Sequence, residues 1–87
     1  MSIEVRKPTE EELRIAEKWP TWVKKISEFS WSYFEKETCL ILKGKAEVET
    51  SDGQKVEFEE GDFVTFPSGI DCIWRIKEPI EKKYNFS

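Results

Sequence analysis

The stretch from Gly61 to Trp74 constrains the fold of this chain more than any other. It begins with Phe63 to Phe66, a short apolar run that is typical of a strand. Pro67-Ser68-Gly69 then predicts a turn, because proline presets one backbone angle and glycine accepts conformations that other residues avoid. A second strand follows, with one face formed by Ile70, Cys72, Trp74 and Ile76. The stretch therefore predicts two β-strands joined by a tight turn.

The same period of two continues on both sides of this stretch. Upstream, Phe29, Trp31 and Tyr33 fall on one face, and the unbroken apolar run Thr38 to Leu42 predicts a strand covered on both sides. Ala46, Val48 and Thr50 are expected to face inward, while Glu47 and Glu49 face solvent.

Glycine and proline divide these strands. Lys43-Gly44-Lys45 predicts a tight turn, and Asp52-Gly53 predicts a hairpin of type I′. Pro79 is expected at the start of a final strand that carries Ile80, Lys82, Tyr84 and Phe86. We expect Lys82 and Lys83 to form a solvated strand end; a lysine at a pocket mouth would favour a ligand with a carboxylate.

Near the N-terminus, Ile3 and Val5 predict a short edge strand, and one segment has helical signals. Thr9 and Glu12 match a capping box, which predicts a helix from Glu10 to Lys18, stopped by Pro20. Short strands at regular spacing joined by glycine turns indicate an all-β barrel or sandwich with one short N-terminal helix. With 87 residues, we expect one domain over residues 1–87.

Composition excludes several classes of function. The 14 basic and 18 acidic residues are interspersed, giving a net charge of −4, so nucleic acid is not an expected partner. The chain lacks a long apolar segment and an apolar leader, which predicts a cytoplasmic protein without membrane contact. Cys39 and Cys72 are then expected to be free thiols. The chain has no histidine, the commonest metal ligand and general base.

Two spacings resemble the paired motifs of the cupin family. Glu37 is followed after six residues by Gly44, and Gly61 is followed by Pro67-x-Gly69 and then Cys72. The Trp-x-Tyr, Glu-Thr-Cys and Cys-x-Trp elements more narrowly resemble the small cupins related to ureidoglycine aminohydrolase. This resemblance implies an RmlC-like, jelly-roll-like β barrel with an internal pocket, often dimeric.

The chain departs from the metal-binding cupins at the ligand positions. The family's His-x-His step falls on Trp31 and Tyr33, Glu37 is retained, and Cys72 replaces the last histidine. Glu37 and Cys72 are both legitimate zinc ligands, and Cys39 lies on the same strand face as Glu37. Two or three such ligands are too few for a selective site, so we expect no metal or other cofactor.

Three functions follow from this pocket. In the preferred interpretation, the chain is a metal-free barrel that binds a small molecule, with a pocket lined by Trp31, Tyr33, Glu37, Cys39, Cys72 and Trp74. In the second, it is a diverged aminohydrolase-like enzyme that acts on a small nitrogen-containing acid, with Glu37 transferring the proton. In the third, the barrel is filled and the protein acts through its surface. A homodimer is expected, and both cysteines are favoured as core residues.

Overall fold

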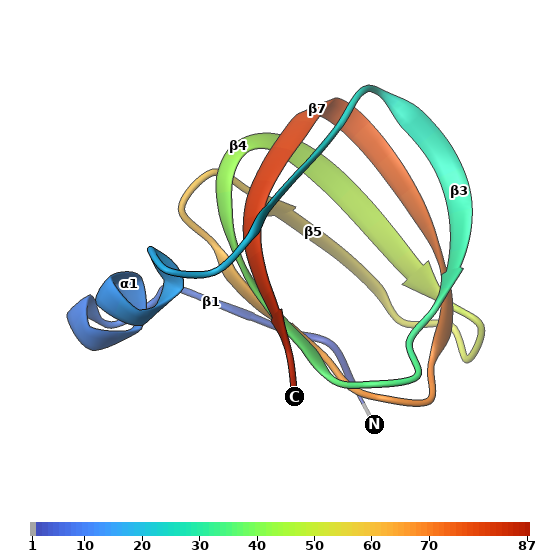
Figure 1. Ribbon diagram of the computed structural model, residues 1–87. Helices are drawn as coiled ribbons and strands as arrows, with labels where there is room; N and C mark the ends of the chain where they lie inside the picture. Colours follow the sequence, from blue (N-terminus) through green and yellow to red (C-terminus); the bar gives the residue numbers. More distant parts are fainter. Residues whose placement is uncertain (1) are drawn as a thin grey trace.

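The computed structural model describes residues 2–87, which form one short helix and a seven-stranded antiparallel sheet (Figure 1). The all-β prediction with one N-terminal helix is confirmed. In chain order the elements are β1 (Glu4–Arg6), α1 (Glu10–Ala16), β2 (Thr21–Lys24), β3 (Ser27–Ser32), β4 (Glu37–Thr50), β5 (Lys55–Glu59), β6 (Phe63–Phe66) and β7 (Asp71–Phe86).

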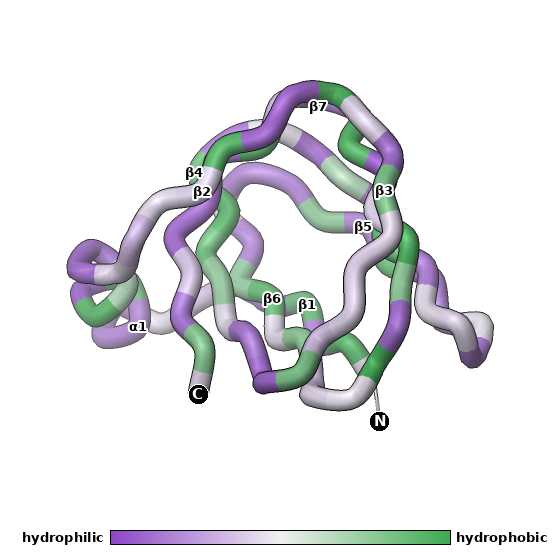
Figure 2. The backbone as a smooth tube through the Cα atoms, turned by 45° about the vertical axis from the view of Figure 1, so that its right-hand side comes forward, coloured by the Kyte–Doolittle hydropathy of each residue, from purple (hydrophilic) through white to green (hydrophobic). Residues whose placement is uncertain are grey.

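The two longest strands, β4 and β7, organise the sheet. They pair with each other from Glu37 opposite Phe86 to Thr50 opposite Cys72. β6 and β5 pair with the two halves of β4, β2 and β3 pair with the two halves of β7, and β1 lies at the edge beside β6. The strands curve around a common interior, with the helix outside it (Figure 2). This arrangement is the jelly-roll-like barrel that was expected.

The predicted turn at Gly44 is wrong, and so is the predicted strand start at Pro79. Both residues lie inside the long strands, where the pairing of β4 with β7 shifts register between Ile41 and Ala46. Gly44 has a φ of 94°, and a Cβ atom at this position would lie 2.1 Å from the carbonyl oxygen of Pro79. The two strands therefore bend together at a bulge that requires glycine on one side and tolerates proline on the other.

The hairpin at Asp52-Gly53 is present, but its turn is not of type I′. Among the described residues only glycines have a positive φ, so Asp52 does not adopt the conformation that a type I′ turn requires. The amide of Gly53 instead donates to the carbonyl of Thr50, and Gly53 itself has a φ of 99°. The side chain of Gln54 bonds both backbone groups of Ile3, which joins this loop to the start of β1.

The run Thr38 to Leu42 is covered on both sides, as predicted. Cys39 and Ile41 face the interior, where they join a core that includes Phe58, Phe66 and Trp74. Leu40 faces outward and packs against Ala16 of the helix. The capping box of Thr9 and Glu12 is formed, but α1 ends two residues earlier than predicted, in a turn tightened before Pro20.

The outer face of β4 and β7 carries interleaved charges. The side chain of Glu47 bonds Arg75 at 2.8 Å and lies 3.7 Å from Lys77. Glu47 was expected to face solvent, but these neighbours cover it and it is buried. No helix within residues 2–87 is long and apolar enough to cross a membrane.

Candidate functional site

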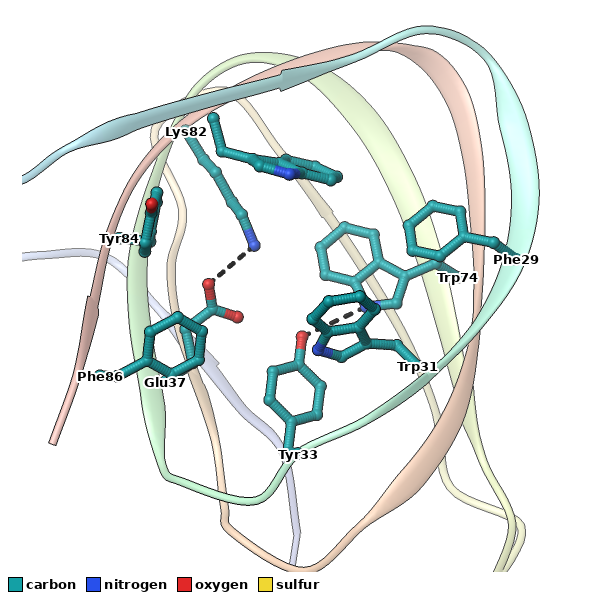
Figure 3. A pocket seen from close by; sticks show the side chains of 9 residues that line it. Phe29, Trp31, Tyr33, Glu37, Trp74, Lys82, Tyr84 and Phe86 are labelled. Carbon is teal, nitrogen blue, oxygen red and sulfur yellow. Dashed lines mark hydrogen bonds and ion pairs between the residues drawn. The ribbon is translucent and has the colours of Figure 1, made fainter.

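A cavity of about 200 Å³ lies inside the barrel and is lined by residues of β2, of β3 and the loop after it, of the start of β4 and of both halves of β7. Its walls are largely aromatic, and its only charged lining residues within 2–87 are one glutamate and one lysine. The lining residues are Trp22, Phe29, Trp31, Tyr33, Glu37, Trp74, Lys82, Tyr84 and Phe86. Figure 3 shows these side chains converging on one space from the surrounding strands.

The period of two along β7 explains how a lysine reaches this interior. Ile80, Lys82, Tyr84 and Phe86 alternate with residues that face outward, and Ile80 and Lys82 are both buried. Glu37 begins β4 directly across the pair, because it lies opposite Phe86 in the register. Alternation on two adjacent strands therefore brings one cation and one anion to the same wall of the cavity.

Lys82 and Glu37 form a buried ion pair. The Nζ atom of Lys82 lies 3.0 Å from Oε2 of Glu37, and the side chains are only 6% and 4% exposed. The same Nζ atom lies 4.7 Å from the ring centre of Trp74 and 4.8 Å from that of Trp22. Burying either charge alone is costly, so the carboxylate and the aromatic faces together compensate the ammonium for its lost water.

Tyr33 supplies a second polar group to the cavity. Its hydroxyl oxygen accepts a hydrogen bond of 3.2 Å from Nε1 of Trp74, and its ring stacks on Phe66. Burial, with a smaller contribution from the negative charge of Glu37, raises the pKa of Tyr33 well above its usual value. The hydroxyl therefore keeps its proton, which is available to a ligand. The hydroxyl and the second carboxylate oxygen of Glu37 both point into the space between the rings (Figure 3).

The structure brings together four of the six residues predicted to form the pocket. Trp31, Tyr33, Glu37 and Trp74 line the cavity, with Trp31 half exposed. Cys39 and Cys72 do not line it.

The two cysteines are core residues with free thiols. Cys39 is fully buried, and burial raises the pKa of its thiol to about 12. Burial also raises the pKa of Cys72 to about 11, and its Sγ atom lies 3.5 Å from the carbonyl oxygen of Trp31. Neither thiol has the lowered pKa of a reactive cysteine.

Lys82 lines the cavity, although its sequence context predicts an exposed side chain. The prediction of a solvated strand end at Lys82 and Lys83 is wrong for Lys82, which is buried. The signal was present in the alternation of Lys82 with Ile80 and Tyr84, but a lysine is rarely fully buried without a partner. That partner, Glu37, lies 45 residues away in the sequence.

The site does not fit the metal centre that the resemblance to metal-binding cupins implies. At the four positions that correspond to ligands, Trp31 has no metal-binding atom, Tyr33 is protonated and Glu37 is engaged by Lys82. The fourth, Cys72, lies outside the cavity lining. Within residues 2–87 no three His, Cys, Asp or Glu side chains are grouped so that they could hold a metal ion. The positive charge beside the retained glutamate is an ammonium of the chain itself.

Comparison with known proteins identifies relatives of this chain. Residues 12–84 match the family described as the EutQ-like cupin domain. The crystal structure of a DUF861 family protein from Thermotoga maritima is 50% identical, with 99% of this chain and 100% of that chain covered and a TM-score of 0.95. No protein with a curated description matches the chain.

More distant structures share the fold. The EutQ protein of Clostridium difficile is 20% identical, with a TM-score of 0.69 over 76% of this chain and 52% of that one. A protein of unknown function from Pseudomonas syringae is also 20% identical, with a TM-score of 0.69 over 77% of this chain and 29% of that one. This chain thus corresponds to only part of those longer proteins.

Proposed function

The chain belongs to the family of EutQ-like cupin domains, and we propose that it is a metal-free member that binds a small molecule in its barrel. The observation that carries this proposal is the cavity itself, with polar groups of Glu37, Tyr33 and Lys82 directed into an aromatic enclosure. Concave, mostly apolar sites with a few convergent polar groups are the usual form of ligand sites.

The size of the cavity defines the scale of the ligand. At about 200 Å³ it is smaller than the roughly 300–1,000 Å³ of sites for drug-sized molecules, so it suits a ligand of one ring or a few functional groups. This space also argues against the interpretation in which the barrel is filled and only the surface acts.

A ligand screen on untagged protein tests the proposal. A polyhistidine tag would add the metal ligands that this chain lacks, so the tag has to be removed first. We expect small polar aromatic compounds to raise the melting temperature, and Glu37→Gln to alter that response. Glu47→Gln is the matched control, because Glu47 lies on the same strand outside the barrel. A library without any binder, or binders equally affected by both variants, would contradict the proposal.

An enzymatic alternative is supported by the free oxygen of Glu37 beside the Tyr33 hydroxyl. In this second proposal Glu37 transfers a proton on a small nitrogen-containing acid, as the resemblance to the ureidoglycine aminohydrolase cupins suggests. The discriminating test is turnover of ureido and amino acid substrates by the wild type and by Glu37→Gln. Turnover that disappears in the variant while binding persists supports catalysis, and no turnover by the wild type leaves binding alone.

A further inference from the structure

We infer that the cavity selects an uncharged planar amide, in which a carbonyl acceptor and an N–H donor stand side by side. This inference rests on the proposed binding function and specifies its ligand class. Three features carry it: the balance of charge in the cavity, the hydrogen-bonding groups left free, and the arrangement of the rings.

The charge of the lining disfavours ionised ligands. Lys82 and Glu37 are the charged groups among the lining residues, and they neutralise each other at 3.0 Å. A carboxylate ligand near Lys82 would be repelled by Glu37, and a cationic ligand near Glu37 would be repelled by Lys82. Either ion would lose its hydration in an aromatic enclosure without a counter-charge of its own, which is costly. A neutral ligand avoids this cost.

The free hydrogen-bonding groups define the polar part of the ligand. Lys82 has three N–H donors and uses one on Oε2 of Glu37. The other carboxylate oxygen of Glu37, Oε1, has no hydrogen-bond partner among residues 2–87. No polar side-chain atom in those residues is both fully buried and without a hydrogen bond, so Oε1 is not sealed from the cavity. Tyr33 accepts from Trp74 and still has its own proton to donate.

An amide complements this set. Its carbonyl accepts from Lys82 or Tyr33, and its N–H donates to the free oxygen of Glu37. A purely apolar ligand would leave these buried groups unpaired, at a cost comparable to several lost hydrogen bonds.

The rings define the rest of the ligand. Phe29 and Trp74 are stacked with their centroids 5.9 Å apart and their planes at 11°, and Trp31 and Phe86 lie on the exposed side of the cavity. Flat aromatic walls favour a flat ligand, because stacked or edge-on ring contacts add to the hydrophobic gain. Small planar amides therefore match the cavity in both its polar and its apolar parts.

Three probes of equal size and different charge test the inference. Benzamide, benzoate and benzamidinium share one ring and the same number of heavy atoms, and Trp22, Trp31 and Trp74 in the lining provide a fluorescence signal. For the wild type we expect benzamide to bind at least about tenfold more tightly than either ion, a difference of about 1.4 kcal/mol.

The variants reverse this preference in opposite directions. Glu37→Gln leaves the charge of Lys82 uncompensated, so benzoate is expected to become the tightest probe. Lys82→Met leaves the charge of Glu37 uncompensated, so benzamidinium is expected to become the tightest. Lys77→Met, which removes an outward-facing lysine from the same strand, is expected to leave the order unchanged. Should Lys82→Met fail to fold, the near-isosteric Glu37→Gln still tests the reversal, with folding checked by circular dichroism.

Each other outcome overturns the inference. Benzoate or benzamidinium binding the wild type as tightly as benzamide excludes selection by charge balance. An unchanged order in Glu37→Gln excludes the ion pair as its cause. If benzamide does not bind but a library compound does, and Glu37→Gln changes that response, the inference fails and the proposed function stands. If no compound binds, both fail.

Discussion

The two halves of the β4–β7 pair face the same interior but have different contents. Beyond the bulge at Gly44 the inward residues of β4 are Ala46, Val48 and Thr50, all buried. Ala46 and Val48 belong to a core that includes Phe58 and Ile76. Before the bulge β4 begins with Glu37, which faces Lys82, Tyr84 and Phe86 across the cavity wall. We call the part of β4 beyond the bulge the closed half, because none of its residues lines the cavity, and the end of the pair that carries Glu37 and Lys82 the open half. Trp74 of β7, opposite Val48, lines the cavity as well.

The backbone pattern is the same in both halves, so side-chain chemistry separates core from cavity. The apolar side chains of Ala46 and Val48 fill the closed half, and the Thr50 hydroxyl there accepts a hydrogen bond from the amide of Gln54. In the open half the ion pair of Lys82 and Glu37 and several large aromatic rings line a cavity that they do not fill. Trp74 both lines this cavity and packs in the core. The barrel thus provides the frame, and a few inward residues decide whether a segment of it is core or site.

The largest effect on stability is expected from breaking the ion pair of the open half. Lys82→Met leaves the Glu37 carboxylate buried without a partner, which we expect to lower the free energy of unfolding by about 3–5 kcal/mol. Denaturant unfolding measures this loss. The double variant Lys82→Met/Glu37→Leu is expected to recover most of it, since no unpaired charge remains. A single variant as stable as the wild type would show that the pair is effectively solvated.

A slightly smaller effect is expected at the bulge that joins the two halves. Gly44→Ala combines a φ of 94° with a Cβ placed against the backbone of Pro79, and we expect a loss of about 3 kcal/mol or more. Gly53→Ala is the matched control, because its φ of 99° is similar but nothing lies within 4 Å of the added atom. Its cost is expected to be about 1 kcal/mol. Equal losses in thermal or chemical unfolding would mean that the close approach to Pro79 does not constrain Gly44.

A third pair of variants separates packing from binding. Val48→Ala in the closed half is expected to cost about 2 kcal/mol and to leave ligand binding unchanged, because Val48 is fully buried and does not line the cavity. Phe86→Ala in the open half is expected to cost less than about 1 kcal/mol, because Phe86 is 42% exposed, and to weaken binding. Urea unfolding and fluorescence titration measure the two effects. Weakened binding in Val48→Ala would show that the halves are not independent.

The smallest effect is expected on the outer face of the closed half. Hydrogen bonding to Arg75 lowers the pKa of Glu47 below its ordinary value of 4.5. A carboxyl group with a lowered pKa stabilises the fold above that ordinary value, and this contribution is lost as pH falls through the lowered pKa. The melting temperature of Glu47→Gln is therefore expected to be slightly below that of the wild type at pH 7, and the difference to shrink on acidification below pH 4.5. A difference that grows on acidification would contradict this sign.

Local signals along the chain predicted most of the fold. Alternation identified the strands, the capping box of Thr9 and Glu12 identified the helix, and the apolar run from Thr38 to Leu42 identified a strand covered on both faces. These signals succeed because each reflects the conformation or exposure of neighbouring residues. Predictions at Gly44 and Pro79 were wrong because a glycine in a turn and a glycine in a bulge have the same local signature.

The candidate site could be predicted only in part. Trp31, Tyr33, Glu37 and Trp74 were predicted correctly from the motifs and line the cavity. Cys39 and Cys72 were wrongly assigned to the lining and lie in the core. An inward-facing residue belongs to the lining or to the core according to how deep in the barrel it lies. Depth is set by the curvature of the whole barrel. Trp22, Phe29, Tyr84 and Phe86 were missed as lining residues for the same reason.

The absence of histidine was evident from the chain alone, and so was an all-β fold with one short helix, because composition and periodicity are properties of adjacent residues. Only the tertiary structure revealed that Lys82 is buried against Glu37, that the bulge bends β4 and β7 together, and that a cavity remains. These features depend on contacts between strands far apart in sequence and on volumes left between side chains. The physical reason is that burying a charge is costly unless the fold places a partner beside it. Whether a charged residue is buried or exposed therefore depends on contacts that the local sequence does not contain.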